Sequence, residues 1–589
     1  MKTFSYIIVL LIGFNGFSQL YQAKDSKIVV KNEVLFVENN IHLNDTIYFR
    51  DEAQLIQGSG NTGNSGTGMI SIYQEGNVNA FSYNFWSAPV GNVDNDVSGN
   101  TDFRLNLIDD PMLATPDITD SQDTEFTLHD EGTSNPLTIS EKWVYTYASG
   151  NEYTDWVYAG SEGAIKTGQG FSMKGMGTGV YGNQTYDFRG KPNNGDVTNA
   201  IDADSQTLMG NPYPSALDSH AFLHNPTNTN SISGSIYYWE QAPGDGNSGS
   251  HLLTDYVGGY ATYTISSDAS VESFTKAVFN TYDENGNENS SVGSSSSSKI
   301  ARRYIPIGQG FVVEASSTGG EIKMDNSQRV YYKESGTKSE FFKLRNNSNQ
   351  GLTNGGPSLA DNLSRLRIYV DFDKEYSREL LMNFHPSFTE AFEYGLESES
   401  PEGIPSDAYW MQDQQPMVIK ALNFNSAMKI PLVVILTEQM DIRVRLANLE
   451  NFGPSQNVFI NDRETGKYYS IRNGGYTFTN IEPGIYSERF FITFQDLTLS
   501  DREVLAQKIK IFVNYEKSVL TILNPELLDI NEVRLFDLKG SAVMDNKNIG
   551  KNDKYEFNLG RLSDGVYVAS LRLEQNQKVN QKLMVKKLR

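Results

Sequence analysis

The apolar residues of this chain occur in short runs, in which β-branched or aromatic residues alternate with polar ones. In residues 26–57, the runs "IVV", "VLFV" and "TIYF" are separated by Asn-Asn and Asn-Asp pairs. Alternation with a period of two is typical of half-buried β-strands, and Asn-rich pairs favour turns. The pattern therefore predicts a small β segment and linker over residues 19–66, which ends in a run rich in Gly, Asn and Ser at residues 58–68.

A series of four dissimilar motifs occurs twice, in the same order. "NFWSAPVGN" is followed by "KWVYTY", "EYTDWVYAG" and "IKTGQGFSMKG", and "NPYPSALD" is followed by "SIYYWE", "GGYATYTIS" and "IPIGQGFVVEA". Chance rarely conserves such an order, so we predict two related β modules from an internal duplication. The segment Trp86–Val90 is then expected to superpose on Tyr213–Leu217, and Gln169 on Gln309. Different strand orders in the two modules would refute the duplication.

The remainder of the chain continues this pattern, with strands such as "LSRLRIYVDF" and "PLVVILTE". We therefore predict an all-β protein built of several β-sandwich modules in tandem. One short helix is expected at "SHAFLH", with Ser215 or Asp218 as its N-cap. The predicted parts are a signal peptide at 1–18, the β segment and linker at 19–66, β modules at 67–190 and 191–335, a β-sandwich at 336–500 and a C-terminal domain at 505–589.

Composition narrows the possible compartments and partners. Residues 1–18 have Lys2, an apolar run and a Gly-Phe-Ser end, which is typical of a secretory signal peptide. No later run is long enough for a membrane span, so no transmembrane segment is expected in the mature chain. The absence of cysteine excludes disulfides and thiolate chemistry. The net charge of −23 disfavours nucleic acid as a partner.

Two candidate metal sites are incomplete in the sequence. His220 and His224 have a helical spacing that suits zinc, but Ala221 stands where a metalloprotease needs Glu. The loop "DNDVSGN" at residues 94–100 resembles an EF-type calcium loop at Asp94, Asp96, Ser98 and Gly99, but its twelfth position is Leu105. We predict no metal, no cofactor and no catalytic residue.

The sequence contains no signature of a catalytic nucleophile. Two further kinds of motif, YYWE and GQGF, each have a structural interpretation as well as a functional one. Glu240 in "YYWE" stands beside aromatic residues that stack on a sugar in one interpretation and form a strand core in the other. The two GQGF motifs lack the third glycine of a dinucleotide loop, so their glycines are expected to permit a bulge before a core strand.

The C-terminal residues resemble a known family of export signals. They contain "KIKIFVNYEKS", "VRLFDLKG", "LSDGVYVASLRL" and a Lys-rich final run "QKLMVKK". This order resembles the type A C-terminal sorting domain of the Bacteroidetes type IX secretion system, without its usual Tyr-Pro-Asn-Pro opening. The resemblance implies an Ig-like domain that the export machinery reads. The alternation places Tyr567, Ala569, Leu571 and Leu573 on one face of a strand.

These observations predict a secreted or cell-surface β protein with a structural or adhesive role. The expected route runs through the periplasm to the outer surface or the medium. The expected partners are the type IX secretion machinery, through residues 505–589, and surface glycans or other cell-surface proteins. The alternative function is a carbohydrate-binding or carbohydrate-degrading surface protein.

The first testable prediction concerns the C-terminal segment. Deletion of residues 505–589 is expected to leave the rest of the protein folded, because a domain with its own alternating strands shares little core with its neighbours. The truncated protein should accumulate in the periplasm, as measured by cell fractionation and immunoblotting. Continued secretion of the truncated protein would contradict the assignment of the export signal.

Overall fold

The computed structural model describes residues 19–586, apart from 59–62, 77, 94–96, 178–183, 242–249, 284–287, 290–298, 337, 340–362, 374–375, 497–507 and 574–577. The predicted signal peptide lies outside the described residues. Almost all the regular structure is β, which confirms the predicted fold class. The short helices are α1 (Ser219–Leu223), α2 (Asn228–Ser231), η1 (Leu105–Leu107), η2 (Glu141–Trp143), η3 (Tyr153–Asp155), η4 (Leu253–Asp255) and η5 (Asn326–Gln328).

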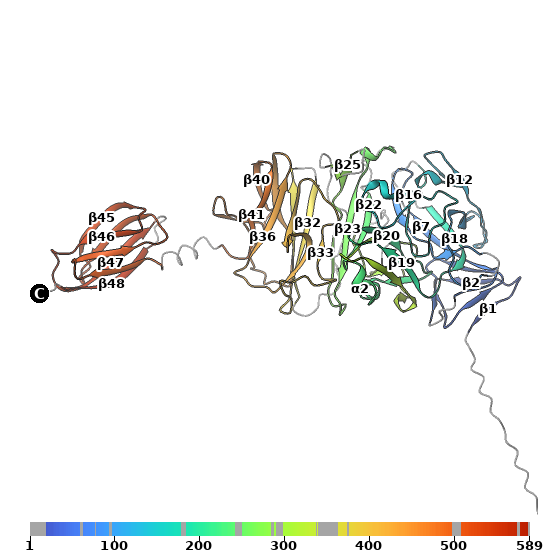
Figure 1. Cartoon of the computed structure of the whole chain (residues 1–589), viewed down its shortest axis with the longest axis horizontal. Helices are drawn as coiled ribbons and strands as arrows, with labels where there is room; N and C mark the ends of the chain where they lie inside the picture. Colours follow the sequence, from blue (N-terminus) through green and yellow to red (C-terminus); the bar gives the residue numbers. More distant parts are fainter. Residues whose placement is uncertain are drawn as a thin grey trace, which may run out of the picture. The chain divides into compact units, whose positions relative to one another are not determined.

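The chain forms two compact units (Figure 1). One comprises Met1–Ile460 and Ser470–Ile492, and the other comprises Asn461–Tyr469 and Thr493–Arg589. The modules predicted up to residue 335 all fall within the first unit, and the boundaries between them stay predictions.

The first unit begins with two stacked coils of parallel strands. These strands are β1 (Leu20–Gln22), β2 (Ile28–Lys31), β3 (Val34–Val37), β4 (Ile41–Leu43), β5 (Thr46–Arg50) and β6 (Gln54–Gln57). β1 pairs with β4, β2 with β5, and β3 with β6, all in parallel. Each strand therefore lies on its counterpart in the next coil, as in a solenoid. The interior contains Ile41, Ile47, Phe49 and Leu55, which are buried.

The two predicted modules follow the solenoid, and we call them the first and the second repeat. The first contains β7 (Met69–Gly76), β8 (Tyr83–Trp86), β9 (Val90–Gly91), β10 (Ile108–Asp110), β11 (Gln122–Asp123), β12 (Glu125–Thr127), β13 (Thr133–Ser134), β14 (Leu137–Ser140), β15 (Tyr145–Tyr147), β16 (Trp156–Tyr158), β17 (Phe171–Lys174) and β18 (Gln184–Pro192). The second contains β19 (Val197–Ile201), β20 (Gln206–Gly210), β21 (Ala216–Asp218), β22 (Ile236–Gln241), β23 (Val257–Ile265), β24 (Glu272–Thr275), β25 (Asn280–Tyr282), β26 (Glu288–Asn289), β27 (Tyr304–Ile305), β28 (Gly310–Glu314), β29 (Gly320–Met324) and β30 (Arg329–Val330).

Four strands follow the same order in the two repeats. In the first repeat the order is β16-β15-β17-β8, and the second contains the series β23-β22-β28-β20, in which β20 ends directly before the motif "NPYPSALD". Each repeat also has antiparallel pairs outside this series, such as β7 with β18 and β19 with β29. The remaining strands pair differently in the two repeats. Phe171 pairs with Trp86 and Phe311 with Met209, so the pairing makes Met209 the counterpart of Trp86, whereas the sequence predicts Tyr213. The duplication itself stays a prediction.

The two repeats contact each other reciprocally through their GQGF motifs. The backbone N–H of Ser87 donates to the carbonyl of Gly308 (2.8 Å), and that of Gly210 donates to the carbonyl of Gly168 (3.1 Å). Gly168 and Gly308 have positive φ values of +83° and +72°. These glycines form a tight turn, where the sequence predicts a bulge, because an L-residue is strained in that conformation.

The second glycine of each GQGF motif allows a close backbone approach. A Cβ atom on Gly170 would lie 2.6 Å from the carbonyl oxygen of Met209 in β20. A Cβ atom on Gly310 would lie 2.6 Å from the carbonyl carbon of Phe85 in β8. β8 and β20 hold matching places in their series of four strands. Gly170 of the first repeat therefore contacts β20 of the second, and Gly310 of the second contacts β8 of the first.

A long sheet completes the first unit, which we call the body. It includes β31 (Ser364–Phe372), β32 (Tyr376–Phe384), β33 (Ser398–Glu399), β34 (Asp407–Gln412), β35 (Gln415–Leu422), β36 (Lys429–Leu436), β37 (Met440–Glu450), β40 (Tyr476–Ile481) and β41 (Gly484–Thr493). The second repeat is attached to this sheet through β24, where Asn383 Nδ2 donates to Ser273 Oγ (2.9 Å). Arg378 and Asp407 form a buried ion pair inside it (2.7 Å). Two further strands are β38 (Phe459–Asp462) and β39 (Lys467–Ser470).

The C-terminal strands form a sandwich of two sheets (Figure 1). They are β42 (Lys510–Asn514), β43 (Val519–Leu523), β44 (Ile530–Phe536), β45 (Ala542–Gly550), β46 (Lys554–Asn558), β47 (Gly565–Leu573) and β48 (Lys578–Val585). The sheet orders are β42-β43-β46 and β45-β44-β47-β48. Tyr567, Ala569, Leu571 and Leu573 are buried in the core of this sandwich, which confirms the predicted inward face.

The reciprocal glycine contact yields a prediction about stability. Gly310→Ala is expected to lower the free energy of unfolding by about 1–3 kcal/mol, because the added methyl group overlaps backbone atoms that have little room to move. Gly403→Ala is the matched control, since no atom lies within 4 Å of a Cβ at that position. Urea unfolding of both variants tests this, and equal stability of the two would contradict it.

Candidate functional site

An aromatic cluster fills the space between the facing sheets of the two repeats. Its buried members include Phe85, Tyr147 and Tyr237, and Trp156 and Trp239 pack at its edge. The rings of Phe85 and Trp239 are stacked at a centroid distance of 6.0 Å, and those of Tyr147 and Trp156 lie 5.0 Å apart. Aromatic side chains from strands of both repeats thus pack against each other. The contact between the two repeats is therefore a packed core.

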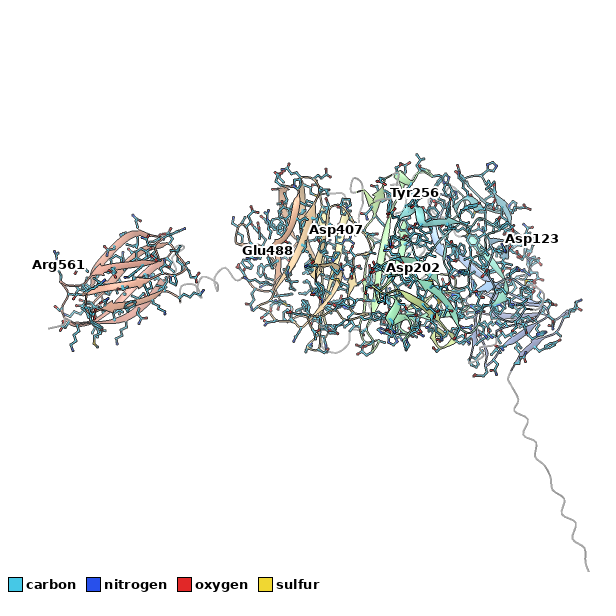
Figure 2. All side chains as sticks on the ribbon, viewed as in Figure 1. Asp123, Asp202, Tyr256, Asp407, Glu488 and Arg561 are labelled. Atoms are coloured by element: carbon cyan, nitrogen blue, oxygen red, sulfur yellow. The ribbon has the colours of Figure 1, made fainter. Side chains whose placement is uncertain are left out.

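A buried lysine lies at one end of the contact. Lys174 is 2% exposed, and its Nζ lies 3.6 Å from the centre of the Trp143 ring. The same Nζ bonds the hydroxyl of Tyr256, which is labelled in Figure 2, at 2.7 Å, and lies 2.9 Å from His251 Nδ1. Burial lowers the pKa of the Lys174 amine to about 7, although Asp130 acts in the opposite direction. The amine is therefore partly uncharged at neutral pH.

A half-buried carboxylate holds the matching position of the second repeat. Glu314 and Lys174 each follow the phenylalanine of their GQGF motif by three residues. Glu314 accepts a hydrogen bond from the Tyr237 hydroxyl (3.2 Å). Burial, together with the nearby Glu399, raises the pKa of Glu314 to about 7. The two equivalent positions thus carry groups of opposite type, and both titrate near neutral pH.

A cavity of about 600 Å³ opens where the solenoid meets both repeats. Its lining combines Arg50 and Tyr73 from the strands β5 and β7, Leu113 and Ile118 from a loop, and Glu334 from the end of the second repeat. Arg50 stacks on Tyr73, with its guanidinium carbon 3.6 Å from the ring centre. This volume falls in the range of about 300–1,000 Å³ that is usual for ligand sites.

Two buried amides hold the floor of the cavity rigid. Gln54 Nε2 donates to the carbonyl of Tyr332 (2.6 Å). Gln74 Nε2 donates to the carbonyl of Ile307 (2.6 Å) and to Glu334 (2.7 Å). These bonds join segments more than 200 residues apart in the chain. The cavity is therefore a fixed part of the fold.

The helical histidine pair is formed, but its nitrogens are already bonded. Asp218 caps α1 by accepting from the backbone N–H of His220 (3.0 Å), as one of the two predicted caps. The rings of His220 and His224 lie 5.0 Å apart. His220 Nε2 bonds the carbonyl of Ser267 (2.9 Å), and His224 Nε2 bonds that of Ile265 (2.7 Å). Both Nε2 atoms thus have backbone partners.

The other sequence candidates do not gather in one place. Residues 94–96 lie outside the described part of the chain, and Leu105 is fully buried in the core. Glu240 is 2% exposed, so it lies inside the protein and not on a sugar platform. Within the described ranges, no three His, Asp or Glu side chains cluster as metal ligands. The predicted absence of a bound metal stays a prediction.

We call Lys174 together with Trp143, Tyr256 and His251 the lysine cage. The sequence analysis identified neither the lysine cage nor the cavity. The equivalence of Lys174 and Glu314 can be read from the two GQGF motifs, and it would have drawn attention to two charged residues in runs that are otherwise apolar. The cavity leaves no such signal, because its lining comes from residues 31–335 and from three parts of the fold.

Comparisons with known proteins identify two parts of the chain. Residues 510–586 match the secretion system C-terminal sorting domain, and residues 124–494 match a domain family of unknown function, DUF8693. No curated protein matches the chain. In the described part of the chain, no helix is long and apolar enough to cross a membrane.

Similar solved structures are distant. The BSP domain of a biofilm associated protein has 8% identity, covers 75% of this chain and 87% of its own, and has a TM-score of 0.12. Tp47, the 47-kilodalton lipoprotein of Treponema pallidum, has 9% identity, covers 63% and 92%, and has a TM-score of 0.12. Scores this low carry no argument about function.

The fold and the C-terminal match define a β-sheet protein that is sorted for export by the type IX secretion system. The match at residues 124–494 spans more than half of the sequence, and the chain belongs to the family DUF8693.

The lysine cage yields a prediction about pH. Because the pKa of Lys174 is about 7 in the folded protein, against 10.5 for an unperturbed lysine, the unfolded chain binds more protons between these values. This group therefore makes stability fall as the pH drops from about 10.5 to about 7. In Lys174→Met this part of the pH dependence should disappear.

The control is Glu314→Gln, which changes a different pH range. The pKa of Glu314 is raised from 4.5 to about 7, so the wild-type carboxyl makes stability fall as the pH rises between these values. Urea midpoints measured from pH 5 to 10 separate the two effects. If stability depends on pH above pH 7 in the same way in Lys174→Met and in wild type, the buried lysine keeps its charge and the prediction is wrong.

Proposed function

We propose that the protein is a non-enzymatic, adhesive component of the cell surface. Export through the sorting domain brings the protein to the outer surface or the medium after passage through the periplasm. A body built of β-sheets suits a structural or binding role at that location. The partners are surface glycans or other cell-surface proteins.

The observation that carries this proposal is a group of exposed apolar side chains at β16, with Val157 and Tyr158 in the strand and Tyr153 in η3 directly before it. Tyr153, Val157 and Tyr158 are 49%, 61% and 50% exposed. Within the described sheets, β16 is the end strand of its sheet. Large apolar side chains gathered at a sheet edge favour contact with another molecule, because water hydrates them poorly.

A carbohydrate-binding role is the second candidate, and two observations favour it. Tyrosine and tryptophan rings at a protein surface stack on sugar rings, and Trp156 lies beside the exposed tyrosines. The cavity between the solenoid and the repeats also combines apolar and polar groups. Carbohydrate degradation has less support, because Glu240, the carboxylate beside the aromatic motif, is buried.

The proposal predicts the effect of removing the exposed tyrosines. Cells that display the double variant Tyr153→Ser, Tyr158→Ser should adhere several-fold less to surfaces coated with host or biofilm material, because the contact area on β16 is lost. Ile485→Ser is the control, since Ile485 is 70% exposed at another place. Adhesion is measured by counting retained cells under flow.

Two results would overturn the proposal. If the double variant and a strain that lacks the protein both adhere as well as wild type, the protein has no adhesive role. Release of reducing sugar ends from glycans by the purified protein would remove the non-enzymatic one.

A further inference from the structure

We propose that the cavity between the solenoid and the two repeats binds a neutral oligosaccharide. This inference rests on the proposed adhesive function and names a ligand class for it. The site differs from the exposed group on β16, because its lining comes from Arg50, Tyr73, Leu113, Ile118 and Glu334.

The cavity is preorganised, which reduces the entropy lost on binding. Arg50 Nε and the Tyr73 hydroxyl both donate to the carbonyl of Ile118, at 2.6 and 3.2 Å. Ser71 links Arg50 to Asp187, since Arg50 Nη2 donates to its hydroxyl (2.8 Å) and that hydroxyl donates to Asp187 (2.6 Å). The guanidinium of Arg50 therefore already donates hydrogen bonds to protein groups. It forms part of the cavity wall, and we expect the side chains at the rim to bind the ligand.

The rim offers both donors and acceptors of hydrogen bonds. Glu52 accepts from the backbone N–H and the hydroxyl of Ser335 (2.6 Å each), which fixes the direction of its carboxylate. Lys31 lies 3.5 Å from Asp51, and both side chains are more than half exposed. Sugar hydroxyls both donate and accept, so they can bond carboxylates and an ammonium at the same rim.

The charges of the rim select against anionic ligands. Asp51, Glu52, Glu75 and Glu334 contribute four carboxylates to the lining, whereas Arg50 is paired with Asp187 and Lys31 with Asp51. Sulfated and uronic glycans would meet repulsion here. The same carboxylates would accept hydrogen bonds from a cationic ligand, so a Lys-rich peptide is the competing ligand that the test must include.

Two exposed apolar side chains complete the rim. Leu113 is 65% exposed and Ile118 is 43% exposed. The C–H faces of sugar rings are apolar, and they cover such side chains while their hydroxyls reach the polar groups nearby. A ligand with alternating apolar faces and hydroxyl edges fits this combination.

The test uses the full chain from residue 19 and isothermal titration calorimetry. The probes are cellotetraose, mannotetraose and an N-acetylglucosamine tetramer, with a sulfated oligosaccharide and a Lys-rich peptide for comparison. At least one neutral probe should bind, and Leu113→Ala should weaken it at least fivefold. Leu128→Ala is the control, because Leu128 is 71% exposed and does not line the cavity.

Each other outcome overturns the proposal in a distinguishable way. Glycan binding that Leu113→Ala leaves unchanged would place the ligand elsewhere and keep the adhesive function. Binding of the sulfated oligosaccharide or of the peptide alone would assign another ligand class. Failure of all neutral probes would remove the carbohydrate site, while the adhesion of the β16 variants tests the broader function separately. Equal melting temperatures of the variants exclude unfolding as the cause.

Discussion

The body of the protein depends on the close backbone approach of its two repeats at the GQGF motifs. Gly168 and Gly308 adopt positive φ values, and Gly170 and Gly310 leave no room for a Cβ atom. The four glycines thus allow strands of one repeat to hydrogen-bond turns of the other. Without this approach the facing aromatic side chains would not meet, and the cavity beside Ile307 would lose its floor.

The aromatic contact also shields two titratable groups from water, Lys174 almost completely and Glu314 in part. Lys174 and Glu314 hold equivalent positions, but one is caged by Trp143 and Tyr256 and the other bonds Tyr237. Burial moves both pKa values toward neutrality from opposite sides. The two modules therefore have different polar interiors, although four of their strands follow the same order.

Local patterns allowed much of the fold to be predicted, because alternation and turn residues act over short distances. The inward face of β47, with Tyr567 and Leu571, and the Asp218 cap of α1 are confirmed. The parallel solenoid was not predicted, since alternation identifies a strand but not its partner about 20 residues away, such as Ile47 for Ile28. The cavity depends on tertiary contacts of Gln54 and Gln74, which no sequence spacing encodes.

The distribution of charge and core between the two units fits the needs of export. Residues 501–589 hold 16 Lys and Arg against 12 Asp and Glu, although the whole chain is strongly acidic. Their sandwich has its own core, which includes Leu520, Val533 and Leu571. A sorting domain that folds on its own core presents its recognition surface independently of the cargo. The chain has no cysteine and therefore no disulfides, so the stability of the body rests on packing, to which the close approach of the two repeats at Gly170 and Gly310 contributes.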